Sequence, residues 1–352
     1  MRCSSFYFCR GSPRTQHNSG PPHENNRLIQ REPTQHNFFE TDMNRQEKLL
    51  HRFNKNAISM EIGPGYNPLL PKREGWQSIS VDHADRTALV EKYRRFDVDI
   101  NAIEEVDVVW TGGPLDKALP TSRLGTVSAC VASHVIEHIP NPIMFFQSMS
   151  RILKPDGLLS LAIPDKRYCF DFFQSITGTG DWLHAWKRGA EIHSQRSMFQ
   201  HIAYTVGTEV GTTWGHGRHL ERFEFLSPSL PQAFTRFQAY SENTGGTYQD
   251  CHAWHFTPSS FELLIVELSQ LGLIPFSVEE SYPTSGCEFM FLLRNTAPPA
   301  LDAAALTQKR LQLLKNIVSE QGEQADQLRR QLVRSRMRRL VAWMSGKLGI
   351  RR

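Results

Sequence analysis

The chain has 352 residues, enough for one large or two ordinary domains, and 39% of them are hydrophobic while 22% are charged. This balance is typical of a globular protein with a sizeable core. No run of about 18 apolar residues occurs, so no membrane-spanning helix is expected. The first residues also lack the apolar core of a secretory signal, and we therefore expect a cytoplasmic protein.

The net charge of +4 is unevenly distributed. Residues 329–352 contain nine Arg or Lys and no acid, which leaves a net −5 on the rest of the chain. The basic character belongs to the C-terminal tail, and nucleic acid is not an expected partner. The six cysteines are scattered, and they do not predict a disulfide framework.

Residues 1–42 are rich in Asn, Gln, Pro, Arg, Ser and His and have no hydrophobic period. Such composition predicts disorder, and this segment need not belong to the mature protein. Met43 precedes a short predicted helix, residues 44–53, and is a better candidate for the start.

The segment 58–68, with the sequence ISMEIGPGYNP, is an apolar strand that ends in a glycine-containing turn. Gly63 and Gly65 let a ligand approach the backbone closely. An NAD-type loop would need a third glycine where Pro68 stands, and the carboxylate of Glu61 would repel a pyrophosphate. S-adenosylmethionine carries no phosphate and offers an ammonium group and ribose hydroxyls as donors, so Glu61 suits that cofactor better.

A second acid follows at the distance that a nucleoside site requires. Residues 78–81 predict a strand, and Asp82 ends it about twenty residues after the glycine loop, the usual separation for a carboxylate that binds ribose.

With two further motifs the chain resembles the class I S-adenosylmethionine-dependent methyltransferases of the small-molecule, bacterial type. The first is ASHVIEH at residues 132–138, and the second is LKPDGL at residues 153–158. The resemblance covers roughly residues 57–294. It implies an α/β fold with a Rossmann-like parallel sheet and S-adenosyl-L-methionine as the cofactor.

Three segments define the predicted organisation: a disordered stretch at 1–42, a methyltransferase domain at 43–294 and a helical basic tail at 295–352. Helices are expected at 142–153 and 257–271, and the two final strands should pair antiparallel at the edge of the sheet. Residues 166–248 break the alternation of strand and helix, so we expect an inserted cap over the site.

Ligands of open parallel sheets bind at the carboxyl ends of the strands, where several polar residues should converge. The residues predicted to bind the cofactor are Glu61, Gly63, Gly65, Asp82 and Ser133. The predicted catalytic residues, each a possible base for an acceptor hydroxyl, are His134, Asp165 and His138. Each has a structural alternative, since Asp165 can cap a turn and His138 can support the cofactor loop.

A metal is not expected. Cys251, His252 and His255 are residue types that bind zinc, but no second ligand pair with standard spacing accompanies them. We interpret His252, Trp254 and His255 instead as a wall of the substrate site.

The acceptor is suggested by two features. Tryptophans in and near the cap can stack on sugar faces. The stretches PDKRYCFD, WHFTPSSF and GCEF resemble methyltransferases that are encoded with bacterial cell-surface glycan enzymes. We predict O-methylation of a saccharide or glycan-linked small molecule. The alternatives are methylation of a quinone or lipid, or a non-catalytic scaffold with the same fold.

The tail predicts a helix over residues 301–348 with apolar residues at helical spacing among arginines. This pattern suits an amphipathic helix on an anionic surface, which would place the protein peripherally at the inner membrane face. A solvated helix or a coiled coil with a protein partner is the alternative.

Overall fold

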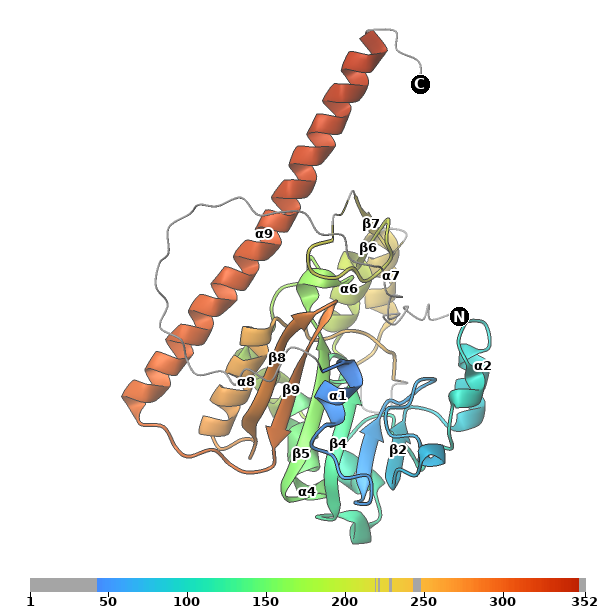
Figure 1. Ribbon diagram of the computed structural model, residues 1–352, viewed down its shortest axis with the longest axis vertical. Helices are drawn as coiled ribbons and strands as arrows, with labels where there is room; N and C mark the ends of the chain where they lie inside the picture. Colours follow the sequence, from blue (N-terminus) through green and yellow to red (C-terminus); the bar gives the residue numbers. More distant parts are fainter. Residues whose placement is uncertain (1–42, 219, 221, 228–229, 243–247, 348–352) are drawn as a thin grey trace.

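The computed structural model describes residues 43–347 apart from 219, 221, 228–229 and 243–247. The predicted disordered segment 1–42 lies outside the described residues. Figure 1 shows a central sheet, a cap at one end of it and one long helix that crosses the molecule.

The described residues form a seven-stranded sheet in the order β3-β2-β1-β4-β5-β9-β8. All neighbours from β3 to β5 pair parallel, whereas β9 pairs antiparallel with both β5 and β8. This is the predicted Rossmann-like α/β fold, and the final hairpin is where the sequence placed it. The strands are β1 Ser59–Ile62, β2 Ser78–Asp82, β3 Val108–Val109, β4 Val127–Ser133, β5 Leu153–Pro164, β8 Ser277–Ser285 and β9 Glu288–Arg294.

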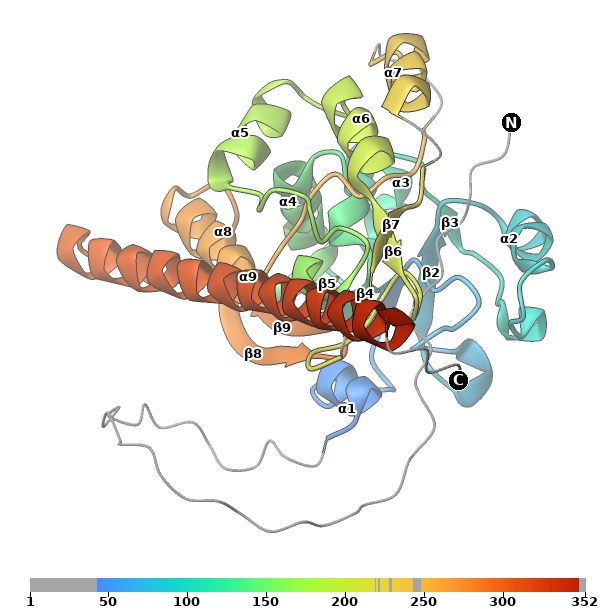
Figure 2. The same ribbon diagram turned by 90° about the horizontal axis from the view of Figure 1, so that it is seen from above.

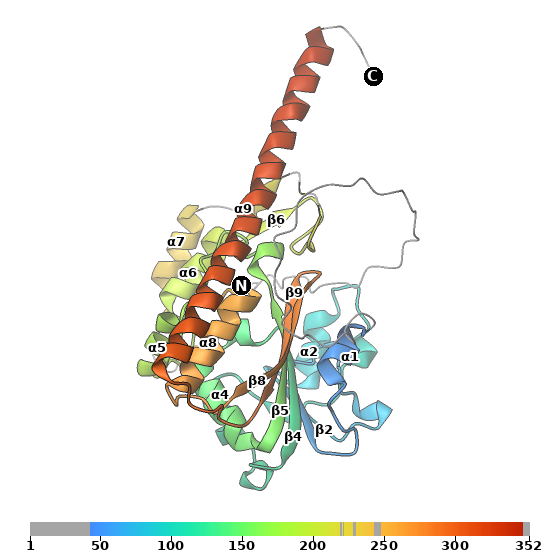
Figure 3. The same cartoon turned by 60° about the vertical axis from the view of Figure 1, so that its left-hand side comes forward.

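Alternation along the strands divides the core between the two faces of the sheet. Cys130 and Leu161 face the larger core, which includes side chains of α4 (Pro142–Ile152) and α8 (Pro258–Gln270). Their neighbours Val131 and Ala162 face the other side, where α1 (Arg45–Leu50) packs. Figure 3 shows α4 and α8 on one side of the sheet and α1 on the other. The remaining short elements before β5 are η1 Lys72–Glu74, α2 Arg86–Tyr93, η2 Ile100–Ala102, α3 Leu115–Ala118, η3 Thr121–Arg123 and η4 Ile136–His138.

The helices begin where the sequence predicts. Asn141 caps α4 by accepting a hydrogen bond from the Met144 amide, and Pro142 occupies the first turn, where no amide donor is needed. At the start of α8 the Ser260 hydroxyl accepts a hydrogen bond from the Thr257 amide at 2.9 Å, and Pro258 occupies the first turn.

Residues 166–248, the predicted cap, contain a series of small elements, of which Figure 2 shows α5 beside α4 and α8. Helix α6 contacts α7, and β6 pairs antiparallel with β7. Its elements are η5 Lys166–Tyr168, α5 Thr179–Lys187, α6 Gln195–Tyr204, β6 Val206–Thr208, β7 Phe223–Phe225 and α7 Leu230–Ala239.

The sequence suggested that the tail helix lies outside the catalytic fold. In the structure, however, part of α9 (Ala303–Lys347) packs against it. Its first part packs on α8, where Leu313 is only 3% exposed. Further along, Glu323 forms an ion pair with Arg167, and Gln324 accepts a hydrogen bond from Lys166. The rest of the helix extends past the body (Figures 1 and 3). Among the described residues, no helix is both long and apolar enough to cross a bilayer.

Candidate active site

The turn after β1 has the backbone conformation that the sequence predicts. Gly63 and Gly65 have φ of 71° and 51°, the left-handed region that favours glycine. A Cβ at Gly63 would come within 3.1 Å of Val135, and one at Gly65 within 3.3 Å of the Tyr93 hydroxyl. Both the conformation and the space therefore require glycine here.

Glu61 holds this loop through hydrogen bonds to two backbone amides. Its carboxylate accepts hydrogen bonds from the amides of Leu69 and Leu70, at 2.8–3.0 Å, and the residue is 5% exposed. Burial raises its pKa to about 7, even though the two amides favour the charged form. Glu61 does not line the cavity described next, and its carboxylate contacts the loop through these two amides.

Asp82 ends β2 beside the glycine turn and lines the cavity. One carboxylate oxygen accepts a hydrogen bond from the Gly65 amide at 3.1 Å, and the other accepts one from the His83 amide at 2.7 Å. The second acid of the predicted nucleoside site is thus fixed next to the loop, where a ribose hydroxyl would donate to it.

A single cavity of about 950 Å³ begins at this turn and continues into the cap. Its volume is at the upper end of the range that small-molecule sites occupy. At the sheet it is lined by Gly63, Gly65, Asp82, His134 and His138. At the cap it is lined by Met198, His201, Tyr240, Tyr248 and Asp250, together with His252.

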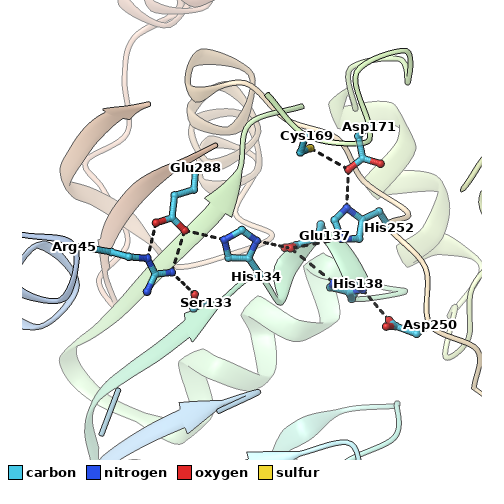
Figure 4. A network of polar contacts seen from close by, with 10 residues as sticks. All are labelled: Arg45, Ser133, His134, Glu137, His138, Cys169, Asp171, Asp250, His252 and Glu288. Carbon is cyan, nitrogen blue, oxygen red and sulfur yellow. Dashed lines mark hydrogen bonds and ion pairs between the residues drawn. The ribbon is translucent and has the colours of Figure 1, made fainter. Parts of the chain in front are cut away.

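His134 follows the last residue of β4 and has φ of 55°, which is unusual for a residue other than glycine. Its Nε2 lies 2.7 Å from Glu288 of β9, which also pairs with Arg45 of α1. Two elements distant in sequence therefore fix the orientation of this ring, as Figure 4 shows.

His138 lies four residues further along, at the end of η4. Its Nδ1 is 2.7 Å from the Asp250 carboxylate. Burial opposes the charged ring, but Asp250 outweighs burial and raises the pKa of His138 to about 9. In this arrangement the ring carries a proton at neutral pH, which favours a role as a charged donor over the predicted role as a base.

His252 reaches the cavity from the segment that returns from the cap to α8. Its Nδ1 lies 2.6 Å from Asp171, which is 1% exposed. Burial lowers the pKa of His252 to about 3, so the ring is neutral. The neighbouring His255 does not line the cavity, and its Nε2 is 3.6 Å from the same Asp171.

Glu137 lies among these three rings (Figure 4). Its Oε1 is 3.6 Å from His134 Nδ1, 3.8 Å from His138 Nε2 and 4.0 Å from His252 Nε2. The residue is fully buried, and within the described part of the chain neither carboxylate oxygen has a hydrogen-bond partner. Glu137, His138 and His252 form a group that could hold a metal ion.

The predicted convergence at the strand ends is only partly present. Asp165 is 0% exposed and does not line the cavity. Its carboxylate forms an ion pair with Arg167 and accepts a hydrogen bond from the Thr284 hydroxyl, each at 2.6 Å. The prediction of a catalytic role for Asp165 does not agree with this geometry. Ser133 is also outside the cavity wall, and its hydroxyl accepts a hydrogen bond from Arg45 at 2.7 Å.

Sequence reasoning missed the partners of the histidines. Asp171 lies inside the cap, and Asp250 lies two residues before His252, yet neither follows a recognisable motif. The nearest signal was the sequence DCHAWH at residues 250–255, which marks a cluster of polar groups without showing which residues they face.

The fold agrees with the family to which the sequence matches. Residues 36–216 match the model of the methyltransferase domain family, just over half of the chain, so the chain belongs to that family. The protein is therefore an S-adenosylmethionine-dependent methyltransferase. The glycine turn and Asp82 fit this cofactor, since they provide a close backbone approach and an acceptor for ribose at the carboxyl ends of β1 and β2.

Similar solved structures include two S-adenosylmethionine-dependent methyltransferases. The one from Aquifex aeolicus is 13% identical, with 72% of this chain and 90% of that chain covered and a TM-score of 0.34. The one from Methanosarcina mazei is 12% identical, with 70% and 96% covered and a TM-score of 0.34. No curated protein sequence matches the chain.

Proposed function

We propose that the enzyme transfers a methyl group to a hydroxyl oxygen of a saccharide or glycan-linked small molecule. The observation that carries this proposal is the continuity of the cavity from the glycine turn and Asp82 to the polar residues of the cap. A cofactor bound at the turn and an acceptor bound under the cap would share one continuous space. Asp250, His201 and Tyr248 on the cap side offer the donors and acceptors that a molecule rich in hydroxyls needs.

When bound, S-adenosylmethionine supplies a methyl group on a positively charged sulfur. The acceptor oxygen would bond to that carbon as the carbon–sulfur bond broke, which would release S-adenosylhomocysteine, and the hydroxyl proton would have to leave the oxygen. We propose that His134 accepts this proton, because the ring lines the cavity and Glu288 holds it through Nε2. The protein otherwise contributes by aligning the two reactants and excluding water.

Acceptor screening by mass spectrometry tests the proposal. The enzyme and S-adenosylmethionine are incubated with nucleotide sugars and methyl glycosides, and in parallel with quinols and lipids. We expect one added methyl group on a sugar hydroxyl. Methylation confined to the quinols or lipids would replace the saccharide with an apolar acceptor, and methylation at nitrogen or carbon would contradict transfer to oxygen.

A second proposal concerns where the enzyme works. The end of α9 carries exposed Leu332, Val333 and Met337 among arginines, which suits a peripheral position on the inner face of the membrane. Co-sedimentation with vesicles tests this. We expect binding to vesicles that contain anionic lipid and none to neutral ones, and equal recovery with both would favour a protein partner.

A further inference from the structure

We propose that Glu137, His138 and His252 form a binding site for a divalent transition-metal ion such as Zn²⁺, open to the acceptor end of the cavity. The three side chains offer one carboxylate oxygen and two imidazole nitrogens, ligand types that Zn²⁺ and related ions prefer. The metal site itself is independent of the acceptor, while its role in the reaction rests on the proposed function.

The carboxylate of Glu137 is buried without a hydrogen-bond partner among the described residues. Glu137 is fully buried, yet both of its oxygens lack a hydrogen bond within the described residues. A buried ionised carboxylate is costly without such partners, so an unsatisfied one calls for an explanation. A bound cation facing Oε1 would satisfy it.

The rings of His138 and His252 are oriented toward the Glu137 carboxylate. His138 and His252 each direct Nε2 toward Glu137 Oε1, at 3.8 and 4.0 Å. His252 Nδ1 also shares a hydrogen bond with Asp171 at 2.6 Å, and His138 Nδ1 lies at ion-pair distance, 2.7 Å, from Asp250. Histidines that bind a metal commonly use their second nitrogen in this way, because a carboxylate there fixes the ring and raises its basicity as a ligand. Figure 4 shows both pairs.

The ligand atoms of Glu137, His138 and His252 lie close enough together to share one ion. The three ligand atoms all lie within 4.8 Å of one another. Ligand bonds of about 2.0–2.1 Å in a tetrahedral site would place such atoms roughly 3.3 Å apart, so small side-chain movements would complete the site. His134 Nδ1, 3.6 Å from the same oxygen, is close enough to act next to the ion.

The site would leave a position for the acceptor, since His138 and His252 line the cavity. Three protein ligands and one open position are typical of catalytic metal sites. A hydroxyl that binds the ion there loses its proton more easily, and His134 would receive that proton. Only the neutral ring can bind the metal, so the ion also displaces the proton of His138.

Metal titration tests the proposal without any acceptor. Untagged full-length protein is stripped with a chelator and titrated with Zn²⁺ by calorimetry, and with Co²⁺ by visible absorption. We expect one equivalent of high-affinity Zn²⁺ and an absorption band typical of tetrahedral Co²⁺. Glu137→Gln and His252→Asn should each weaken Zn²⁺ binding at least 100-fold, whereas His184→Ala, an exposed histidine of α5, should not change it.

Binding of S-adenosylhomocysteine by each variant shows whether it is still folded. If a variant that binds S-adenosylhomocysteine also keeps wild-type Zn²⁺ affinity, or if the folded wild type takes up no ion, the site does not exist. Failure to methylate any hydroxyl acceptor, with metal binding intact, would overturn the proposed function and leave the metal site standing.

Discussion

Arg45 and Glu288 are separated by 243 positions in the chain and form a two-point ion pair, with Nε to Oε1 at 2.5 Å and Nη2 to Oε2 at 3.0 Å. The pair joins α1 to β9. Because Glu288 also contacts His134 and Arg45 contacts Ser133, the pair fixes the carboxyl end of β4 from two sides. Its effects on stability and on chemistry can be measured separately.

Stability should depend on pH through Glu288. Burial opposes its charge, but His134 and Arg45 outweigh burial and lower its pKa from 4.5 to about 2. A lowered acid pKa contributes stability that is complete above pH 4.5 and is lost as the pH falls toward 2. We expect a loss of about 3 kcal/mol in unfolding free energy over that window. Glu288→Gln should flatten this part of the curve in urea denaturation.

The matched control is Glu262→Gln, which removes a partly exposed pair with Lys309. We expect it to keep the pH dependence and to change stability by less than about 1 kcal/mol. Equal curves for wild type and Glu288→Gln would contradict the assignment.

Removal of the charge on Asp82 should weaken cofactor binding. Asp82→Asn loses a charged acceptor next to the glycine turn, and we expect S-adenosylhomocysteine affinity to fall about 10- to 100-fold in calorimetry. Asp85→Asn is the control, because Asp85 is exposed and caps α2, a task that Asn also performs. An equal loss in both variants would mean that Asp82 has no specific role.

Substitution of Glu61 should act through the loop. Glu61→Ala leaves the buried amides of Leu69 and Leu70 without an acceptor, at a cost of about 2–4 kcal/mol in unfolding free energy. Cofactor affinity should fall as the loop loses its shape. Glu74→Ala, at an exposed position in the neighbouring η1, should leave thermal unfolding unchanged. A stable variant with unaltered affinity would remove Glu61 from the site.

His134 is expected to contribute to the methyl-transfer step and not to cofactor binding. His134→Gln keeps a polar side chain but cannot accept the hydroxyl proton, so we expect kcat to fall about 10²- to 10⁴-fold. Affinity for S-adenosylhomocysteine should stay within about threefold of wild type. His184→Gln controls for general effects. A kcat close to wild type in His134→Gln would show that another residue acts as the base.

Two adjacent leucines test the docking of α9. Leu313 is 3% exposed and Leu314 is 43% exposed. Leu313→Ala should lower the free energy of unfolding by about 2–3 kcal/mol, because it opens a cavity between α9 and the body. Leu314→Ala should change it by less than about 0.5 kcal/mol. Equal effects in thermal unfolding would indicate that the helix is not docked in solution.

The positions that could be predicted from the sequence are those where local pattern and strand order are sufficient. Gly63 and Gly65 lie in the turn after β1, Asp82 ends β2, and parallel strands bring their ends together. His134 also lies at such an end. The start of α4 at Pro142 and that of α8 after Thr257 could be predicted, because helix starts depend on a few neighbouring residues.

The remaining parts depend on contacts across the fold. Asp165 follows a strand end too, but its chain turns back so that Arg167 and Thr284 take its carboxylate. The pairing of Asp171 with His252 joins positions on either side of the cap. No local pattern encodes that pairing, since it depends on how the inserted segment packs.

The place of β9 in the sheet has a consequence for synthesis on the ribosome. It pairs with β5 on one side and β8 on the other, and residues 165–287 are made between β5 and β9. Until β9 has been made, one edge of β5 has no partner strand, and unpaired backbone groups at a strand edge promote association between chains. Long-range pairing of this kind also slows folding, so yield on expression should depend strongly on temperature and chaperone supply.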